Sequence, residues 1–482
     1  MDIREGSYST LAERKEKLER RRAERRKQIV IRSAIAIGCL VLVVFGIVMI
    51  TKLLNNGERK KSVSVEVVKE ETKEEKIKRI IGEADTLALG YDYDAAIELL
   101  KTIEDYETEE KVKEAIQKHE DTKASCVPVN IDEVTHIFYH SLVVDPDRAF
   151  ANQETNPQAV GNNQWMTTVD EFNKITQEMY DRGYVMVSIH DLYEEVPDEA
   201  GNTVYQPAEI LLPEGKKAFV LSLDDLSYYH AYEGYGYAAK LILDKEGKVV
   251  NEYIDANGET HVGLYDVVPL MDAFVEEHPD ASYKGAKGII ALTGYNGVLG
   301  YRSDETYDLN NPNCDIHQKK WIETHEGFDL QKEIEGAKKV AEAMKSNGWE
   351  FASHTWGHMM VGDRSLESIQ ADTARWKKNV EPVVGPVDTI IFAHGQDLQK
   401  QGEYNPGNAK YQYLWSEGFR VFCNVDSNEH ATLIAKDHVR QGRRNIDGYR
   451  IYYNAIGSQN NLSDLFDAKA ILDPKRPPVP KL

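Results

Sequence analysis

Residues 217–225 read KAFVLSLDD, an apolar run that ends in two adjacent carboxylates, Asp224 and Asp225. A short apolar run bounded by polar residues is typical of a buried β-strand. On both sides of it, similar runs alternate with segments whose apolar residues recur at helical spacing. Such alternation indicates parallel strands joined by crossover helices. Further strands are expected at 135–142, 184–189, 287–295, 349–354, 388–395 and 419–425, and helices at 169–183, 266–278, 330–348 and 365–383.

The repetition of this unit predicts an α/β fold, a (β/α) barrel that is either complete or incomplete, rather than an open doubly wound sheet. A Gly-rich phosphate-binding fingerprint follows none of the predicted strands, which argues against a nucleotide-binding sheet. In barrels the chemistry lies at the carboxyl ends of the strands. Residues 449–459, YRIYYNAIGSQ, lie where a late strand is expected to end.

The N-terminal part of the chain has the pattern of a membrane anchor. Residues 1–32 hold eleven basic and six acidic residues, and the nineteen residues that follow carry no charge. At ~1.5 Å per residue this stretch roughly spans a ~30 Å hydrocarbon core. We expect a transmembrane helix at 33–52, with residues 1–32 as a cytoplasmic tail and the C-terminal domain outside the cell membrane. A cleaved signal peptide is the alternative, but the basic region is long and a small-residue cleavage site is missing.

The composition excludes several classes of protein. The chain has 482 residues, with 58 basic and 80 acidic side chains and a net charge of −22. Nucleic-acid binding requires a basic surface, so this balance argues against nucleic acid as a partner. Four cysteines in a chain of this length rule out a disulfide-dense scaffold. With 41% hydrophobic residues, the chain can form a packed core.

Three segments make up the rest of the chain. Residues 53–72 are polar and are expected to form a linker. Residues 73–122 are expected to be helical and resemble one tetratricopeptide-like helix pair, which would serve as a spacer stalk, as a brace packed on the next domain, or as a site for a protein partner. Residues 127–475 form the main domain, with an insertion at about 244–328. The insertion is expected to contain a hairpin that turns at Asn257-Gly258.

A second motif follows another predicted strand. Residues 354–358 read HTWGH, so His354 and His358 are four residues apart at a strand end. This spacing places both rings on one face of a helical turn, where they can bind one metal ion. Each motif alone is weak evidence of a metal site, because paired acids commonly cap loops and paired histidines are commonly structural.

Together the two motifs resemble those of the polysaccharide deacetylases, carbohydrate esterase family four. The family's TFDD-type motif matches SLDD at 222–225, and its H-[ST]-x-x-H motif matches HTWGH at 354–358. The segment THIFYHSLVVD at 135–145 resembles the Tyr-His segment of the permuted branch that includes the poly-N-acetylglucosamine deacetylases. The resemblance covers roughly residues 134–467.

The resemblance implies a role for each matching residue. Asp225, His354 and His358 would bind a divalent metal, with Zn²⁺ the first choice and Co²⁺, Ni²⁺ or Mn²⁺ the alternatives. Three protein ligands leave room for water, as a hydrolytic metal site requires. Asp224 would be the general base.

The general acid is the point where the chain departs from the family. The late LxH motif that supplies an acid histidine in many members is missing, so the resemblance to the permuted branch assigns this role to His140. Leu226 replaces a glycine that usually follows the acid pair. The sequence IIFAHG stands where the family has a proline-containing loop, and His394 in it is expected to replace the acid, to orient Asp224 or to be inert.

The expected substrate is an N-acetylhexosamine polymer, either peptidoglycan or an exported polysaccharide. Trp356, Tyr295 and Tyr301 are the candidates for stacking on sugar rings. The sequence therefore favours a membrane-anchored, metal-dependent N-deacetylase. Two alternatives stay open: a degenerate carbohydrate-binding or wall-scaffold protein, and a metal-dependent esterase or amidase that acts on another substrate.

Overall fold

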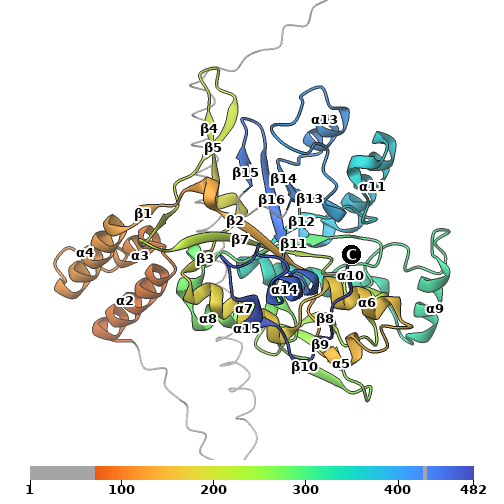
Figure 1. The fold of residues 1–482 in the computed structure, drawn as a ribbon. Coiled ribbons are helices and arrows are strands. Elements are labelled where there is room, and N and C mark those ends of the chain that lie inside the picture. Colours follow the sequence, from red (N-terminus) through yellow and green to blue (C-terminus); the bar gives the residue numbers. More distant parts are fainter. Residues whose placement is uncertain (1–70, 427–430) are drawn as a thin grey trace, which may run out of the picture. The chain divides into compact units, whose positions relative to one another are not determined.

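The computed structural model describes residues 71–426 and 431–482, and its compact unit comprises residues 73–196 and 203–482. Seven parallel strands of this unit close into a ring, which confirms the predicted (β/α) barrel (Figure 1). The ring is closed but has one strand fewer than the eight of a full (β/α) barrel. In order around the ring the strands are β2 (Thr135–Tyr139), β7 (Lys217–Asp224), β11 (Ile289–Leu292), β12 (Glu350–Ser353), β13 (Thr389–Ile391), β14 (Val421–Val425) and β16 (Val439–Asn445).

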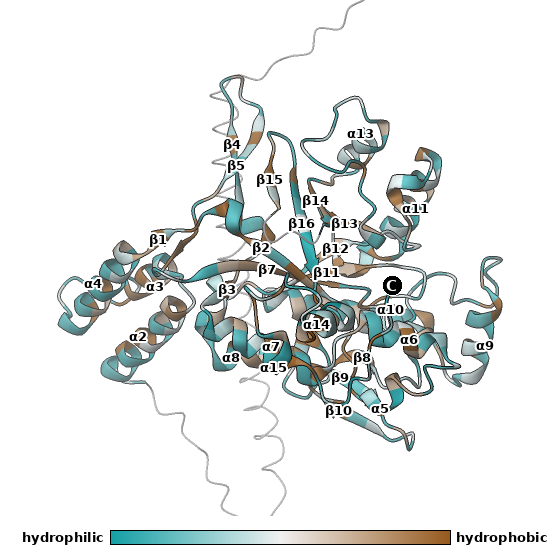
Figure 2. Cartoon of the chain, viewed as in Figure 1, coloured by the Kyte–Doolittle hydropathy of each residue, from teal (hydrophilic) through white to brown (hydrophobic). Residues whose placement is uncertain are grey.

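Helices in the crossover connections and after the last strand pack on the outside of the ring. In most of these helices the apolar residues face the strands and the polar residues face outward (Figure 2). They are α5 (Pro146–Ala149), α6 (Pro157–Trp165), α7 (Val169–Asp181), α8 (Val267–Glu277), α10 (Leu330–Ser346), α11 (Leu366–Asn379), α12 (Glu381–Val384), α13 (Ala409–Ser416), α14 (Gly448–Ala455) and α15 (Ala468–Ile471).

Two of the expected strands are placed differently. The strand expected at 184–189 is β3 (Tyr184–Met186), which lies beside the ring and pairs with residues 217–219 of β7, with one further bridge from Met186 to Ser282. The late strand is not at 449–459, where the chain forms α14; it is β16, whose sequence VRQGRRN lacks the apolar character of a core strand. That polar composition explains why the position of this strand was predicted wrongly.

Successive residues of a barrel strand belong in turn to two hydrophobic cores, one between the strands and the outer helices and one inside the ring. On β7, Phe219, Leu221 and Leu223 pack against the outer helices, whereas Ala218 and Val220 belong to the core inside the ring. Successive side chains of a strand point to opposite faces. Residues 222 and 224 therefore share the inner face with Ala218 and Val220, and Asp224 lies at the carboxyl end of the ring interior.

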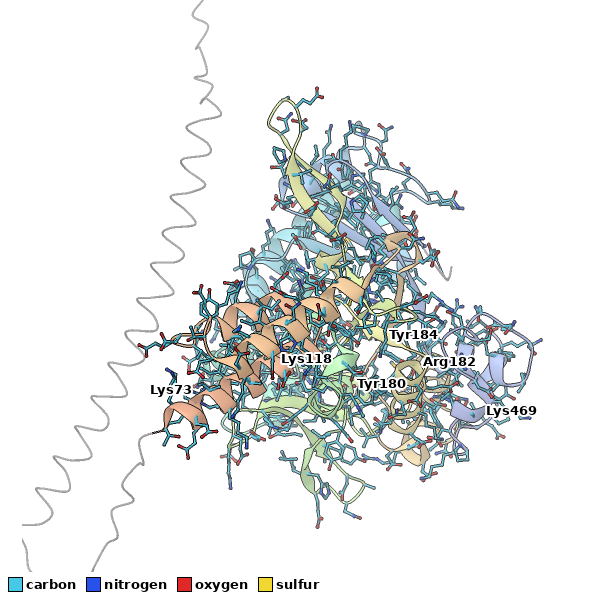
Figure 3. The ribbon with its side chains drawn as sticks, turned by 90° about the vertical axis from the view of Figure 1, so that its left-hand side faces the viewer. Lys73, Lys118, Tyr180, Arg182, Tyr184 and Lys469 are labelled. Carbon is cyan, nitrogen blue, oxygen red and sulfur yellow. The ribbon has the colours of Figure 1, made fainter. Side chains whose placement is uncertain are left out.

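The N-terminal helices α2 (Lys73–Leu89), α3 (Tyr93–Leu100) and α4 (Glu110–Ser125) pack on one another, and residues around the turn between α2 and α3 contact the barrel. The Tyr91 hydroxyl donates a hydrogen bond to the backbone carbonyl of Asp280 at 2.7 Å, and its ring stacks on Tyr283. Tyr180, labelled in Figure 3 beside these helices, donates from its hydroxyl to the Asp280 carboxylate. Of the roles considered for this segment, the contacts fit the brace.

The range predicted as the insertion, 244–328, includes α8 and β11 of the barrel. The rest of it, together with the strand directly before it, forms a separate antiparallel sheet and a long loop. The sheet has the order β10 (Thr260–Gly263), β9 (Val249–Ile254) and β8 (Ala238–Leu243). The hairpin turn at Asn257-Gly258 is confirmed, with Gly258 at φ 82°. The loop after β11 contains α9 (Ile316–Thr324). Four short strands form two small pairs, β1 (Val127–Pro128) with β6 (Leu211–Leu212) and β4 (Tyr193–Pro197) with β5 (Thr203–Pro207), and β15 (Thr432–Ile434) runs antiparallel to β16.

Among the helices of residues 71–426 and 431–482, none is both long enough and apolar enough to cross a bilayer. The segment 33–52, for which the sequence predicts a membrane span, lies outside the described residues, as do the tail and most of the linker.

Candidate metal centre

The residues singled out in the sequence gather at the carboxyl end of the barrel. Asp224 ends β7 and Asp225 follows it, while His354 follows β12 and His394 lies just beyond β13. His140 directly follows β2, the neighbour of β7, and the pairing of Tyr139 with Leu223 places His140 level with Asp224. Strand register therefore brings these five residues to one edge, as expected for a barrel site.

Asp225, His354 and His358 form a group suited to a metal ion. One ligand atom of each lies within 4.8 Å of the others, and His358 Nε2 is 3.5 Å from Asp225 Oδ2. His354 donates from Nδ1 to the Ile391 carbonyl at 2.7 Å, which leaves Nε2 for the metal. Burial lowers the pKa of His354, so its imidazole is neutral, the form that binds metals. Two imidazoles and a carboxylate are a donor set that suits Zn²⁺.

A fourth side chain fixes the orientation of Asp225. The Tyr229 hydroxyl donates to Asp225 Oδ1 at 2.5 Å and lies 2.5 Å from Thr293 Oγ1. Because Oδ1 is held in this way, Oδ2 is the oxygen that faces His358. Partners of this kind orient metal ligands. The sequence offered one signal for Tyr229, namely its position four residues after Asp225.

Backbone strain is concentrated at the same edge. Asp225, Thr355, His358 and His394 have φ values of 61°, 62°, 52° and 56°. This left-handed region costs free energy for residues other than glycine and persists only where the surroundings impose it. Strain of this kind clusters at functional sites, which supports a functional role for these four positions.

Asp224 is held by an arginine that sequence reasoning missed. Arg443 of β16 donates from its two terminal nitrogens to Asp224 Oδ1 at 2.7 Å and to Oδ2 at 2.9 Å, and both side chains are buried. Although burial by itself would raise it, Arg443 and His354 hold the pKa of Asp224 well below its usual range. Asp224 is therefore an ionised carboxylate beside the candidate metal ligands. In the sequence, the only indication of a role for Arg443 was the polar composition of its strand, VRQGRRN.

The ion pair rests on a polar layer inside the barrel. Arg443 also donates to Ser222 Oγ at 3.0 Å, and Ser222 is 2.9 Å from His136 Nε2. The other ring nitrogen of His136 lies 2.9 Å from Gln441 Oε1. A network in which each buried group has a partner is rigid. This network, which lies deeper inside the barrel than Asp224, fixes the direction of the Asp224 carboxylate.

The two candidate acids lie on different sides of the site. His140 is close enough to Asp224 and Asp447 to lower the pKa of each carboxyl, although burial raises the pKa of Asp447 to about 6 overall. The His394 ring lies 4.3 Å from the ring of His358, centroid to centroid. Burial lowers the pKa of His394, with a contribution from His358. The structure thus brings both candidates to the site, His140 beside the base and His394 beside a metal ligand.

The three aromatic candidates have different surroundings. Tyr295 is half-buried at the site and stacks on Tyr229 at 5.2 Å. Trp356 is also half-buried, and its indole nitrogen is already bonded to Asp304. Tyr301 lies in the core, and its predicted role in substrate binding stays a prediction.

The Tyr301 ring is only 9% exposed and belongs to the core. It packs against the backbone of Gly336 on α10, and Lys240 Nζ lies 4.3 Å from its ring centre. The loop that carries Tyr301 turns its ring toward α10, which spacing along the sequence did not reveal.

Two buried carboxylates hold the loop that contains both metal-binding histidines. Asp372 of α11 accepts from the backbone nitrogens of Trp356 and Gly357 at 2.7 and 2.8 Å. Asp304, in the loop of the insertion, accepts from the Trp356 indole at 2.7 Å and is fully buried. Through the Asp304 side chain, the insertion thus contacts the loop that carries His354 and His358. Asp304 has the geometry of a positioning residue.

Asp304→Ala is expected to weaken metal affinity about 10- to 100-fold, because the loop loses its outer anchor. Asp304→Asn, which keeps an oxygen acceptor, should lose less. The measurement is competition for Zn²⁺ with a chelator on the full-length protein, alongside thermal unfolding. Asp308→Ala is the matched control, since Asp308 lies in the same loop and its side chain accepts from Asn310 at the surface. Unchanged affinity in a folded Asp304→Ala protein would contradict the positioning role.

Comparison with known proteins gave one match to a family model and one similar solved structure. Residues 317–396, which include His354, His358 and His394, match the family model for polysaccharide deacetylase. The matched residues are those of the segment from α9 to the turn that follows β13. The solved structure of the Streptococcus pyogenes deacetylase PplD in complex with acetate is similar at 14% identity, over 67% of this chain and 94% of that one, with a TM-score of 0.32. Searching the curated proteins gave no significant match.

Proposed function

We propose that this chain is a metal-dependent hydrolase that removes N-acetyl groups from an N-acetylhexosamine polymer, peptidoglycan or an exopolysaccharide. The observation that carries the proposal is the group of Asp225, His354 and His358, with the ionised Asp224 directly beside it. The match of residues 317–396 to the polysaccharide deacetylase model supports the same chemistry. Deacetylation of a sugar amide requires a water nucleophile, a base that accepts its proton and an acid that protonates the leaving amine.

The residues of the site divide these tasks among themselves. A divalent metal held by Asp225, His354 and His358 would supply Lewis acidity toward water and the amide carbonyl. Asp224 accepts the proton of the attacking water, because its carboxylate is ionised and fixed by Arg443. His140 gives a proton to the leaving amine, in keeping with the layout of the permuted branch. His140 lies close to the carboxyl groups of both Asp224 and Asp447.

The same proposal includes the place of action. The basic residues 1–32 and the uncharged stretch that follows support a single membrane span at 33–52, with the barrel on the outer face of the cell membrane. An anchored barrel would act on polymer at the membrane surface, and neutral acetylated sugar suits the acidic composition of the chain. A protein partner for the helices α2–α4 stays a prediction.

The test uses the full-length protein in detergent. A chelator removes bound metal, and Zn²⁺, Co²⁺, Ni²⁺ or Mn²⁺ is then added back separately before incubation with chitooligosaccharides or peptidoglycan. Acetate release that needs added metal is the expected result. Release from an O-acetylated polymer instead would identify the esterase alternative. Binding of polymer without acetate release, beside an active control enzyme, would reject the hydrolase and support the non-catalytic alternative.

A further inference from the structure

Asp266 is a fully buried carboxylate that bonds to two distant parts of the chain. Its Oδ1 accepts from the backbone nitrogen of Val267 at 2.8 Å and thereby caps the N-terminus of α8. The same oxygen accepts from the backbone nitrogen of Leu142 at 3.0 Å. Leu142 belongs to the His140 loop, which we define as residues 140–143. One carboxylate oxygen thus caps a helix and also holds the loop that carries the candidate acid.

The position of the His140 ring depends on the backbone of this loop. The ring has an edge-on contact with Phe138, at 5.8 Å between ring centres, and no hydrogen bond with any of the described residues. The backbone around it is held at two points, where Leu142 donates to Asp266 and Val143 donates to the Thr167 carbonyl at 2.9 Å. Loss of the first hold would therefore move the ring relative to its surroundings.

The Asp266 carboxylate also adjoins the segment that follows Asp225. Burial raises the pKa of Asp266 to about 6, and the hydroxyls of Tyr228 and Ser141, which lie close to the carboxyl, lower it. Tyr228 is 2% exposed and has a φ of 49°, in the left-handed region. A residue keeps this conformation only where its surroundings impose it. Asp266 therefore lies between the segment of the candidate base and the loop of the candidate acid.

The antiparallel sheet of the insertion supplies the next member of this buried network. Asn251 of β9 donates from Nδ2 to the Tyr228 hydroxyl at 3.1 Å. Its Oδ1 accepts at 3.1 Å from the backbone nitrogen of Tyr265, which directly precedes Asp266. Hydrogen-bonded side chains in a buried network hold one another rigidly. The sheet thus fixes both Tyr228 and the segment that carries Asp266.

We infer that Asp266 is a positioning residue, whose hydrogen bonds hold the loop of the acid His140 beside the base Asp224. The inference rests on the proposed function and adds to it a residue outside the metal group. When the amide C–N bond breaks, the leaving nitrogen takes a proton from His140, so a displaced loop slows this transfer. A misplacement of about 1 Å can lower a rate about 10²-fold. The earlier proton transfer from water to Asp224 does not involve His140.

Asp266→Ser separates this role from the helix cap. Serine caps a helix about as well as aspartate, but its shorter side chain cannot also reach Leu142. For the full-length protein loaded with Zn²⁺, kcat on a chitin hexamer should fall about 10- to 100-fold, while KM changes by about twofold at most. On para-nitrophenyl acetate, whose leaving group departs without a proton, kcat should fall by less than about threefold. Equal losses on the two substrates, or no loss on the hexamer, would overturn the inference.

Three further variants control for the charge, the network and the cap. Asp266→Asn keeps Oδ1 and replaces only Oδ2, which has no hydrogen-bond partner among the described residues, so it should restore most of the hexamer rate. A loss as large as that of Asp266→Ser would contradict a role through hydrogen bonds. Tyr228→Phe, which removes one hydroxyl of the network, should lower the hexamer rate less than Asp266→Ser does. Asp329→Ser changes the exposed cap of α10, where Asp329 accepts from two backbone nitrogens of its own helix, and should keep the rate.

Hydrogen exchange separates this inference from the proposed function. Mass spectrometry should show exchange at the Leu142 amide about tenfold faster or more in Asp266→Ser than in wild type, because this amide loses its acceptor. Unchanged exchange in a folded Asp266→Ser protein would reject the positioning role, even if wild type releases acetate. A wild-type protein that releases no acetate would reject the proposed function, and faster exchange in Asp266→Ser would then still support the hold on the His140 loop.

Discussion

Asp224→Asn is expected to lower the rate of acetate release about 10³-fold, while Zn²⁺ remains bound. The expected loss is that of a positioned general base, which contributes about 10²- to 10⁴-fold. The asparagine side chain keeps the shape of the carboxylate but cannot accept a proton. Asp225, His354 and His358 keep their positions, since none of the hydrogen bonds that hold them involves Asp224.

The pH dependence of this effect has a definite sign. The pKa of Asp224 is depressed in the folded protein, so its carboxylate stays ionised well below pH 5 and the base form is present throughout the neutral range. The ratio of wild-type rate to Asp224→Asn rate is therefore expected to be constant between pH 5 and pH 9. Rates across this range and metal content after dialysis are the measurements.

Two further variants distinguish loss of the base from loss of the metal and from a general disturbance of the barrel. Asp225→Asn should lose the metal as well as the activity, because it changes a ligand. Asp464→Asn alters a second ion pair of β16: Asp464 binds both terminal nitrogens of Arg444 at 2.7 Å, away from the metal group. It should keep the rate. A folded, metal-loaded Asp224→Asn protein with a rate near that of wild type would exclude Asp224 as the base.

Local patterns in the sequence were sufficient to predict much of the fold. The apolar run before Asp224 predicts a strand, and its alternation with helical segments predicts a barrel. Both features depend on residues that are near each other in the chain. The same holds for the HTWGH loop, since spacing of four residues and a preceding strand place His354 and His358 together.

Features that depend on distant contacts were not accessible in this way. Arg443 lies 219 residues from Asp224, and its strand has polar residues on the inner face because they form a buried network there. A strand of this kind has no apolar signature. Tyr301 is the opposite case, a residue that is near the site residues in the sequence. The fold of its loop turns the ring into the core, and this turn could not be predicted from the sequence.

The second large effect concerns stability rather than catalysis. Arg476→Ala is expected to lower the free energy of unfolding by about 3–5 kcal/mol, because it leaves a buried charge without its partner. Arg476 donates from Nε and one terminal nitrogen to the two oxygens of Glu171, at 2.7 and 2.6 Å, and neither side chain is exposed. Glu171 also completes the capping box of α7 with Thr168. The C-terminal segment is thereby tied to the start of a barrel helix.

Unfolding by urea, followed by circular dichroism, measures this loss. The neighbouring Lys475→Ala is the matched control, because Lys475 forms only an exposed ion pair with Asp147 and should change stability by about 0–1 kcal/mol. The double variant Glu171→Met with Arg476→Met should recover most of the loss, since burying two apolar side chains avoids an unpaired charge. If Arg476→Ala unfolded at the same urea concentration as Lys475→Ala, the buried pair of Glu171 and Arg476 would not contribute the expected amount of about 3–5 kcal/mol to the stability of the barrel.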